Sequence, residues 1–203
     1  MQDIHILPSH FYLEGDVVQI AKKLLGKIIV TAIDQQLTLS RIVETEAYDG
    51  RVDKACHAYP NRKTRRTAVM FKEGGRSYVY LCYGIHYLFN VVTHKENEPN
   101  AVLLRAVEPI AGIDVMKQRR KINNLVNLAN GPGKLAHALG INRSLNDVVL
   151  YDPLSPIWIG EDVKAQEPSE IIQTKRIGVD YAEEDALLPW RFYIKNSLYV
   201  SKK

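Results

Sequence analysis

The stretch RIVETEAY, at residues 41–48, contains the side chains best suited to acid–base chemistry. The side chains of a β-strand alternate between its two faces, so Glu44, Glu46 and Tyr48 would share one face. Their apolar neighbours indicate a strand close to the core, where a carboxylate is costly unless it is paired or functional. Two interpretations stay open: a reactive pair of acids, or a strand end that emerges into solvent with two acids of no special role.

Arg105 interrupts an apolar run, AVLLRAV at residues 101–107, in which its neighbours favour burial. A buried guanidinium needs a carboxylate partner, which we expect to be Glu46 or Glu44, with Glu108 as the local competitor. A buried acid beside an arginine stays ionised near neutral pH and could act as a general base on water. The alternative is a structural ion pair, which is the commoner kind.

The segment YVYLCYGIHYLFN, at residues 78–90, predicts two strands that reverse at Tyr83 and Gly84. At such a reversal the ring of Tyr83 would project, as an aromatic wedge that enters the minor groove of DNA must. The alternative is ordinary aromatic packing in a sheet. Asn90 ends this largely apolar stretch, so its amide must find a partner or contact a ligand.

Positive charge is concentrated between residues 51 and 76. That window has eight Lys or Arg residues and two acidic ones, which nets +6, whereas the whole chain nets +4. A local positive surface suits a polyanion such as nucleic acid, and a solvated basic loop is the alternative. The turn GPGK at 131–134 lacks the P-loop pattern, but Lys134 and the helix start could still hold a phosphate. His57 has no second ligand pair at zinc spacing, so we expect no metal site.

The elements that would position these residues favour an α+β fold: a mainly antiparallel, curved β-sheet with surrounding helices and a protruding β-hairpin. A helix is expected from the cap Asp16 to Gly26, a second after Pro109, and a third at 132–139. Strands are expected at residues 27–33, 37–48, 78–83, 85–92, 101–107, near 158, 176–179 and 191–194.

Length and composition set the remaining bounds. The 203 residues predict one domain, 1–203, and 46% hydrophobic with 25% charged residues is ordinary for a globular protein. No apolar run approaches the ~20 residues that a membrane helix needs, and the first residues lack the pattern of a signal peptide. Two cysteines exclude a disulfide framework. We therefore expect a cytoplasmic protein without membrane contact.

Taken in order, these motifs resemble the alkyladenine (3-methyladenine) DNA glycosylase family, of the single-domain type. The resemblance covers almost the whole chain from Leu24 onward. Its motifs are RIVETEAYDG with the following Cys56 and His57, SYVYLCYGIHYLFN, VLLRAVEP, NGPGKL, KRIGVD and WRFYI. The hairpin departs from relatives at Cys82, His86 and Leu88, which affects the expected breadth of the pocket.

The resemblance implies a role for each matched residue. Glu46 would activate the attacking water, while Arg105 and the backbone of Ile177 would help to hold it. Glu44 has no catalytic counterpart and is interpreted as structural. The aromatic walls of the base pocket would be Tyr48, His57 and Tyr80, and Asn90 would disfavour the amino group of normal guanine. On the DNA, Tyr83 would be the wedge in the minor groove, and Arg65, Arg66 and Lys134 would contact phosphates.

By resemblance, the chain would be a monofunctional glycosylase that flips alkylated or deaminated purines out of duplex DNA and leaves an abasic site. In a bacterium it would be associated with the nucleoid. No lysine matches a Schiff-base position, so no strand cleavage is expected. The only implied partner is double-stranded DNA with a damaged purine; no cofactor, metal or obligate protein partner is implied, and a monomer is the simplest state. Two alternatives are a non-catalytic damaged-DNA binding module and a hydrolase of free nucleosides.

Overall fold

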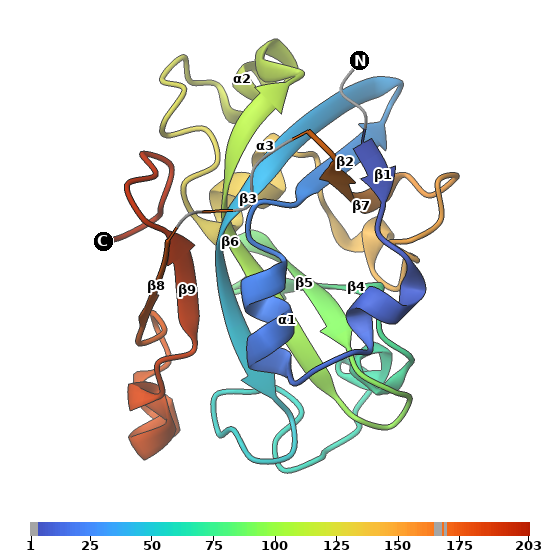
Figure 1. The fold of residues 1–203 in the computed structure, drawn as a ribbon, viewed down its shortest axis with the longest axis vertical. Coiled ribbons are helices and arrows are strands. Elements are labelled where there is room, and N and C mark those ends of the chain that lie inside the picture. Colours follow the sequence, from blue (N-terminus) through green and yellow to red (C-terminus); the bar gives the residue numbers. More distant parts are fainter. Residues whose placement is uncertain (1–3, 165–167, 169) are drawn as a thin grey trace.

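An antiparallel β-sheet forms the centre of the molecule (Figure 1). The structure is a computed structural model that describes residues 4–164, 168 and 170–203. Within these residues there are nine strands: β1 (Ile4–Ile6), β2 (Ile28–Ile33), β3 (Gln36–Asp49), β4 (Arg76–Cys82), β5 (His86–Thr93), β6 (Asn100–Ala111), β7 (Ile157–Asp162), β8 (Ile171–Thr174) and β9 (Arg191–Ile194).

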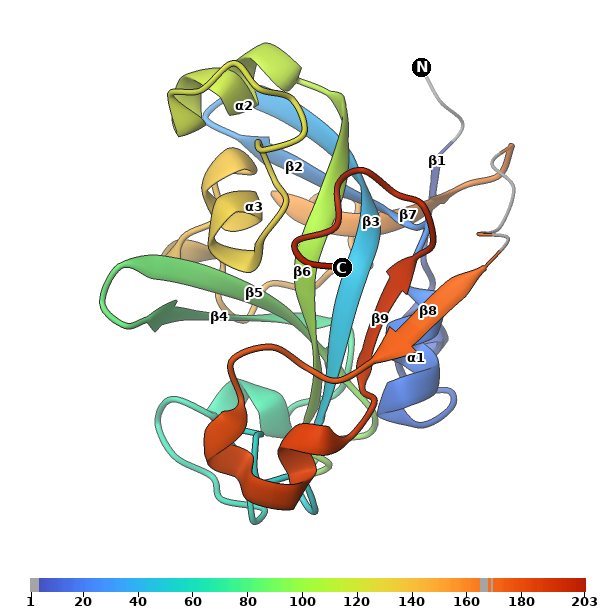
Figure 2. The same cartoon turned by 90° about the vertical axis from the view of Figure 1, so that its left-hand side faces the viewer.

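The strands follow the order β1-β7-β2-β3-β6-β5-β4, and β9 pairs with both β3 and β8. Every pairing is antiparallel, which confirms the predicted α+β class with a mainly antiparallel sheet. Figure 2 shows β4 and β5 running across the direction of β3 and β6 and ending in a hairpin that projects from the body. The sheet therefore curves, and β3 lies at its centre with neighbours on both sides.

Helices cover both faces of this sheet. The described residues form three α-helices, α1 (Val17–Lys23), α2 (Ile113–Arg120) and α3 (Pro132–Ala138), and four 3-10 helices, Ser9–Tyr12, Ala68–Phe71, Arg143–Leu145 and Asp180–Leu187. In Figures 1 and 2, α1 lies on one side of β3 and β6, while α2 and α3 lie on the other. None of the helices in this part of the chain is long and apolar enough to cross a membrane.

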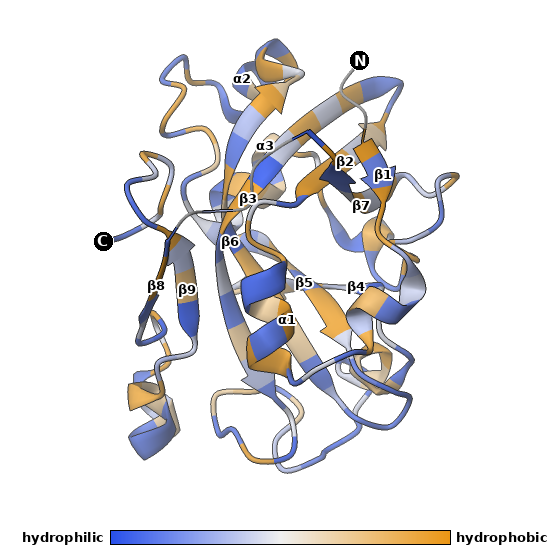
Figure 3. Cartoon of the chain, viewed as in Figure 1, coloured by the Kyte–Doolittle hydropathy of each residue, from blue (hydrophilic) through white to orange (hydrophobic). Residues whose placement is uncertain are grey.

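The first helix begins where its local sequence predicts. Asp16 accepts a hydrogen bond from the backbone of Gln19, whose side chain accepts one from the backbone of Asp16, which together form a capping box. Helix α1 ends at Lys23, and Gly26 follows in the left-handed region with φ 86°. Its buried face includes Ile20 and Ala21, and Figure 3 shows hydrophobic and hydrophilic residues side by side along the helix.

One expected element is wrong, one is confirmed with a later start, and two short strands were not predicted. Residues 176–179 form a bend rather than a strand, because this backbone is turned toward buried side chains of the site, and the strand lies earlier, at β8. The helix expected after Pro109 is confirmed as α2, which begins at Ile113; Pro109 itself is still part of β6, where it lies opposite Ser40 next to a register shift. The short strands β1 and β8 have too few residues for a clear alternating pattern.

Candidate active site

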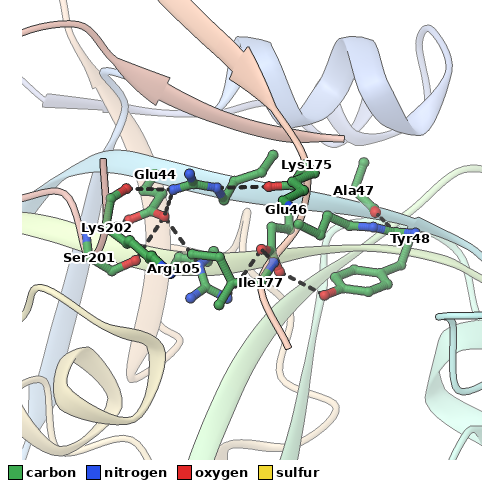
Figure 4. A network of polar contacts seen from close by, with 11 residues as sticks. Glu44, Glu46, Ala47, Tyr48, Arg105, Lys175, Ile177, Ser201 and Lys202 are labelled. Carbon is green, nitrogen blue, oxygen red and sulfur yellow. Dashed lines mark hydrogen bonds and ion pairs between the residues drawn. The ribbon is translucent and has the colours of Figure 1, made fainter. Parts of the chain in front are cut away.

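Glu46 lies at the centre of the candidate site, on β3 and fully buried. Two groups donate hydrogen bonds to its carboxylate, and a third forms an ion pair with it (Figure 4). Tyr48 Oη donates to Oε2 at 2.7 Å, the backbone N–H of Ile177 donates to Oε1 at 2.8 Å, and Arg105 Nη1 lies 3.2 Å from Oε1. All three groups interact with the ionised form of the acid, which accepts hydrogen bonds but cannot donate one.

Two irregularities in the pairing of β3 with β6 bring the charges together. Ile42 is opposite Val107 and Glu44 is opposite Ala106, so Val43 is an extra residue on β3; Arg105 is the extra residue on β6. Arg105 thereby contacts both glutamates that share its face, with Nε 3.2 Å from Glu44 Oε1. Glu108, the expected competitor, instead pairs with Arg41 at 3.1 Å.

A cavity of about 580 Å³ opens above Glu46. Its wall includes the three groups that contact the carboxylate, namely Tyr48, Arg105 and Ile177. Glu46 itself lies just beneath this wall. The remaining lining is largely aromatic and apolar, with a few polar groups, as is typical of small-molecule sites. It includes His57, Arg66, Tyr78, Tyr80, Tyr83, Asn90, Leu103, Pro132 and Tyr181.

The aromatic wall is held by a chain of contacts through His57. Its ring lies edge-on to Tyr80 at 4.6 Å between centroids, and Tyr80 stacks on Tyr78 at 5.3 Å. His57 Nδ1 is 2.9 Å from Tyr78 Oη, and Arg66 Nη2 is 3.3 Å from His57 Nε2. Burial by the pocket wall, followed by the charge of Arg66, lowers the pKa of His57 to about 4. The imidazole is therefore neutral at pH 7, with Nε2 accepting from Arg66 and Nδ1–H donating to Tyr78.

Arginine side chains also stack on two of the aromatic rings. The guanidinium of Arg66 lies 4.7 Å from the centroid of Tyr80, and that of Arg176 lies 4.8 Å from the centroid of Tyr48. Burial is the main cause that raises the pKa of the Tyr48 phenol well above its usual value, so Tyr48 remains a hydrogen-bond donor to Glu46.

Asn90, inside β5, and Tyr83, in the turn before β5, both border the cavity. Asn90 is buried, and its Nδ2 donates to the backbone oxygen of Tyr78 at 3.1 Å, which answers the need for a partner. Tyr83 is 91% exposed at the tip of the β4–β5 hairpin, with φ 50°, and Gly84 follows with φ 71°. The left-handed backbone at both residues reverses the chain and leaves the ring of Tyr83 projecting into solvent.

The predicted phosphate contacts are spread around this opening. Arg65 is exposed, and Arg66 stands in the cavity wall. Lys134 is exposed on the first turn of α3, where its Nζ lies 2.8 Å from Asn130 Oδ1. Pro132, at the start of the same helix, lines the cavity, so Lys134 lies near its rim.

A buried ion pair behind the site could not be identified from the sequence. Arg176 donates to Asp53 through both Nη atoms, at 2.5 and 2.8 Å, and both side chains are fully buried. Arg176 also donates to the backbone oxygen of Ala47 at 2.9 Å. The pair fixes the bend that presents the N–H of Ile177 to Glu46. In the sequence, the only indication of this ion pair is that Arg176 directly precedes Ile177.

Comparison with known proteins gives consistent matches over nearly the whole chain. A family model described as methylpurine-DNA glycosylase matches residues 10–198. A protein of Natranaerobius thermophilus is 46% identical over 192 residues, 94% of this chain and 96% of that relative. One of Chlamydia felis is 48% identical over 200 residues, 98% of this chain and 100% of that relative. Both carry the name "Putative 3-methyladenine DNA glycosylase".

Proposed function

The chain belongs to the methylpurine-DNA glycosylase family, and we propose that it removes alkylated or deaminated purines from duplex DNA by hydrolysis of the N-glycosidic bond. It is a DNA glycosylase of DNA repair. The name of its relatives suggests 3-methyladenine as one substrate base. The single observation that supports the proposal best is a buried Glu46 beneath an aromatic cavity, with two hydrogen bonds and an ion pair to its carboxylate.

Glu46 is the proposed general base. Its carboxylate would take a proton from the water that attacks the sugar carbon C1′, and its negative charge would stabilise the positive charge that develops there. Arg105 and the N–H of Ile177 would orient both the carboxylate and the water. The products would be the free base and an abasic site, without a strand-cleaving step because no lysine stands at the reacting position.

The aromatic cavity is the proposed site of the flipped base. A purine inside a duplex is inaccessible, so the nucleotide has to swing out at a cost of a few kcal/mol. Tyr83 would fill the gap in the stack and offset part of that cost. A purine that is alkylated on a ring nitrogen is cationic and would gain roughly 0.5–2 kcal/mol from the rings of Tyr48, His57 and Tyr80. Asn90 would disfavour the amino group of normal guanine.

DNA would be held by the basic rim of the cavity. Arg65, Arg66 and Lys134 are the proposed phosphate contacts, which would make affinity fall with salt. We propose that one copy of the chain acts alone on the duplex, without a metal or an organic cofactor, in the cytoplasm. A non-catalytic binding module would not need Glu46, and a nucleoside hydrolase would not need an exposed Tyr83.

The test uses a duplex with one hypoxanthine or 1,N6-ethenoadenine, incubated with protein and then treated with hot alkali, which cleaves at abasic sites. Wild type should produce cleavage. Glu46→Gln should lose roughly 100-fold or more of the rate, the usual scale for a general base, while it still binds the lesion. Glu108→Gln is the matched control, because Glu108 pairs with Arg41 away from the cavity. Full activity of Glu46→Gln would refute the assignment.

A further inference from the structure

A second buried carboxylate, Glu44, lies behind the cavity wall and has no part in the mechanism above. It precedes Glu46 by two residues on the same face of β3, and its side chain is fully buried. Oε1 is contacted by Arg105 Nε at 3.2 Å, Arg191 Nη1 at 2.8 Å and Ser201 Oγ at 2.8 Å, and Oε2 by the backbone N–H of Ser201 at 2.6 Å. Glu44, Arg191 and Ser201 are absent from the cavity lining, so they act behind it.

Arg191 links this cluster to two backbone segments. Its Nη1 donates to the backbone oxygen of Lys202 at 2.8 Å, and its Nε donates to that of Lys175 at 3.1 Å. Lys175 is two residues before Ile177. Both donors that converge on Glu46 Oε1 are therefore supported from behind: the guanidinium of Arg105 by Glu44, and the chain before Ile177 by Arg191.

We propose that Glu44, held in place by Ser201, is a positioning residue that sets how Arg105 meets Glu46. This inference rests on the proposed role of Glu46. A free guanidinium prefers a bidentate pair with one carboxylate, through two parallel N–H···O bonds. Because Glu44 engages Nε, Arg105 presents Nη1 to Glu46. Without Glu44 in place, Arg105 would turn and engage both oxygens of Glu46, including the one that has to accept a proton from water.

Ser201 has the decisive place in this cluster because it contacts both oxygens of Glu44. A buried carboxylate that loses its donors remains charged and poorly solvated, which is unfavourable unless neighbouring donors move toward it. The nearest such donors are the side chains of Arg105 and Arg191. Loss of the Ser201 contacts would thus shift Arg105 relative to Glu46, although Ser201 is not part of the cavity lining.

Three substitutions of Ser201 separate its contacts. Ser201→Pro removes both the N–H and the hydroxyl, Ser201→Ala removes only the hydroxyl, and Ser201→Thr keeps both. Lys203→Ala, two residues away and exposed, is the control. The measurements are the single-turnover excision rate with enzyme in excess, and the Kd for a duplex with a non-cleavable abasic analogue, both well below the unfolding temperature of each variant.

We expect Ser201→Pro to lower the single-turnover rate by about 10- to 100-fold, the usual effect of a small misplacement in an active site. Ser201→Ala should lose less, Ser201→Thr should restore the rate, and Kd should stay within about twofold of wild type because the aromatic side chains of the cavity are unchanged. Equal rates for Ser201→Ala, Ser201→Pro and wild type would overturn the proposal, as would losses of rate and binding in parallel.

The contact between Arg105 Nε and Glu44 can also be measured without any excision, by using NMR to monitor exchange of the Arg105 Nε proton with solvent. The proton should exchange slowly in wild type and in Lys203→Ala, and faster in Ser201→Pro and Ser201→Ala. Equal exchange in all four proteins would refute the positioning role whether or not the wild type excises a base. If the wild type excises no damaged purine, but the Arg105 Nε proton still exchanges faster in the Ser201 variants, the result would count against the proposed function alone.

Discussion

The ion pair between Asp53 and Arg176 should be one of the most important single contacts for stability. Asp53→Asn keeps the size of the side chain but removes its charge. Both partners are fully buried, and Asp53 accepts from both Nη atoms of Arg176 and from the N–H of Ala55. The variant leaves the guanidinium buried without a counter-charge and places an amide N–H₂ against one of its donors.

Breaking a buried pair by removal of one partner costs about 3–5 kcal/mol. Since the remaining amide oxygen can still accept one bond from Arg176, we expect the lower end, about 3 kcal/mol. For a domain of this size that corresponds to a fall in Tm of roughly 6–12 °C. The measurement is urea unfolding at pH 7, with a thermal scan as a second readout.

Glu170→Gln is the matched control, because it makes the same chemical change in an exposed pair. Both carboxylate oxygens of Glu170 lie 2.8 Å from Lys195 Nζ, but the side chains of Glu170 and Lys195 are 53% and 46% exposed. Surface pairs of this kind contribute about 0–1 kcal/mol. If Asp53→Asn loses no more stability than Glu170→Gln, then burial does not decide the strength of these pairs and the reasoning is wrong.

Two further predictions concern the pocket and its rim. Tyr83→Ala should weaken capture of a lesion duplex by about tenfold or more, because stacking of a base on an aromatic side chain contributes ~1–3 kcal/mol. Leu154→Ala, equally exposed, is its control in a fluorescence anisotropy titration, and equal affinities would exclude the wedge. His57 has a pKa of about 4 in the folded chain against 6.5 in the unfolded one, so between these values only the unfolded chain takes up the proton and stability falls as pH drops. His57→Gln should flatten this decline in urea unfolding at pH 7 and pH 5, and the same slope in both proteins would contradict the assignment.

The local features of this fold could be predicted from the sequence because their causes are local. The cap of α1 depends on residues three apart, and the alternation in RIVETEAY places Glu44 and Glu46 on one face. The reversal at Tyr83 follows from the glycine after it. The family resemblance supplied the proposed roles of the pocket residues, which spacing alone could not.

What escaped prediction depends on contacts between distant segments. Arg176 lies 123 residues from Asp53, so no local pattern reports their pairing. Residues 176–179 bend instead of forming a strand for the same kind of reason. The pair with Asp53 holds Arg176, and the N–H of the next residue, Ile177, donates to Glu46 rather than to a neighbouring strand. The extra residues in β3 and β6, which let Arg105 reach both glutamates, are likewise a property of the assembled sheet.

The contact between Glu44 and Ser201 also has a consequence for how the chain folds during its synthesis. The two residues are 157 positions apart in the chain. A ribosome adds about 5–20 residues per second, so about 8–30 seconds separate the synthesis of the acid from that of its last donor. During this interval β3 has no complete set of partners for its buried charge. Glu44 therefore gains its complete set of donors only after residue 201 has been synthesised, and until then water has to take the place of the Ser201 donors.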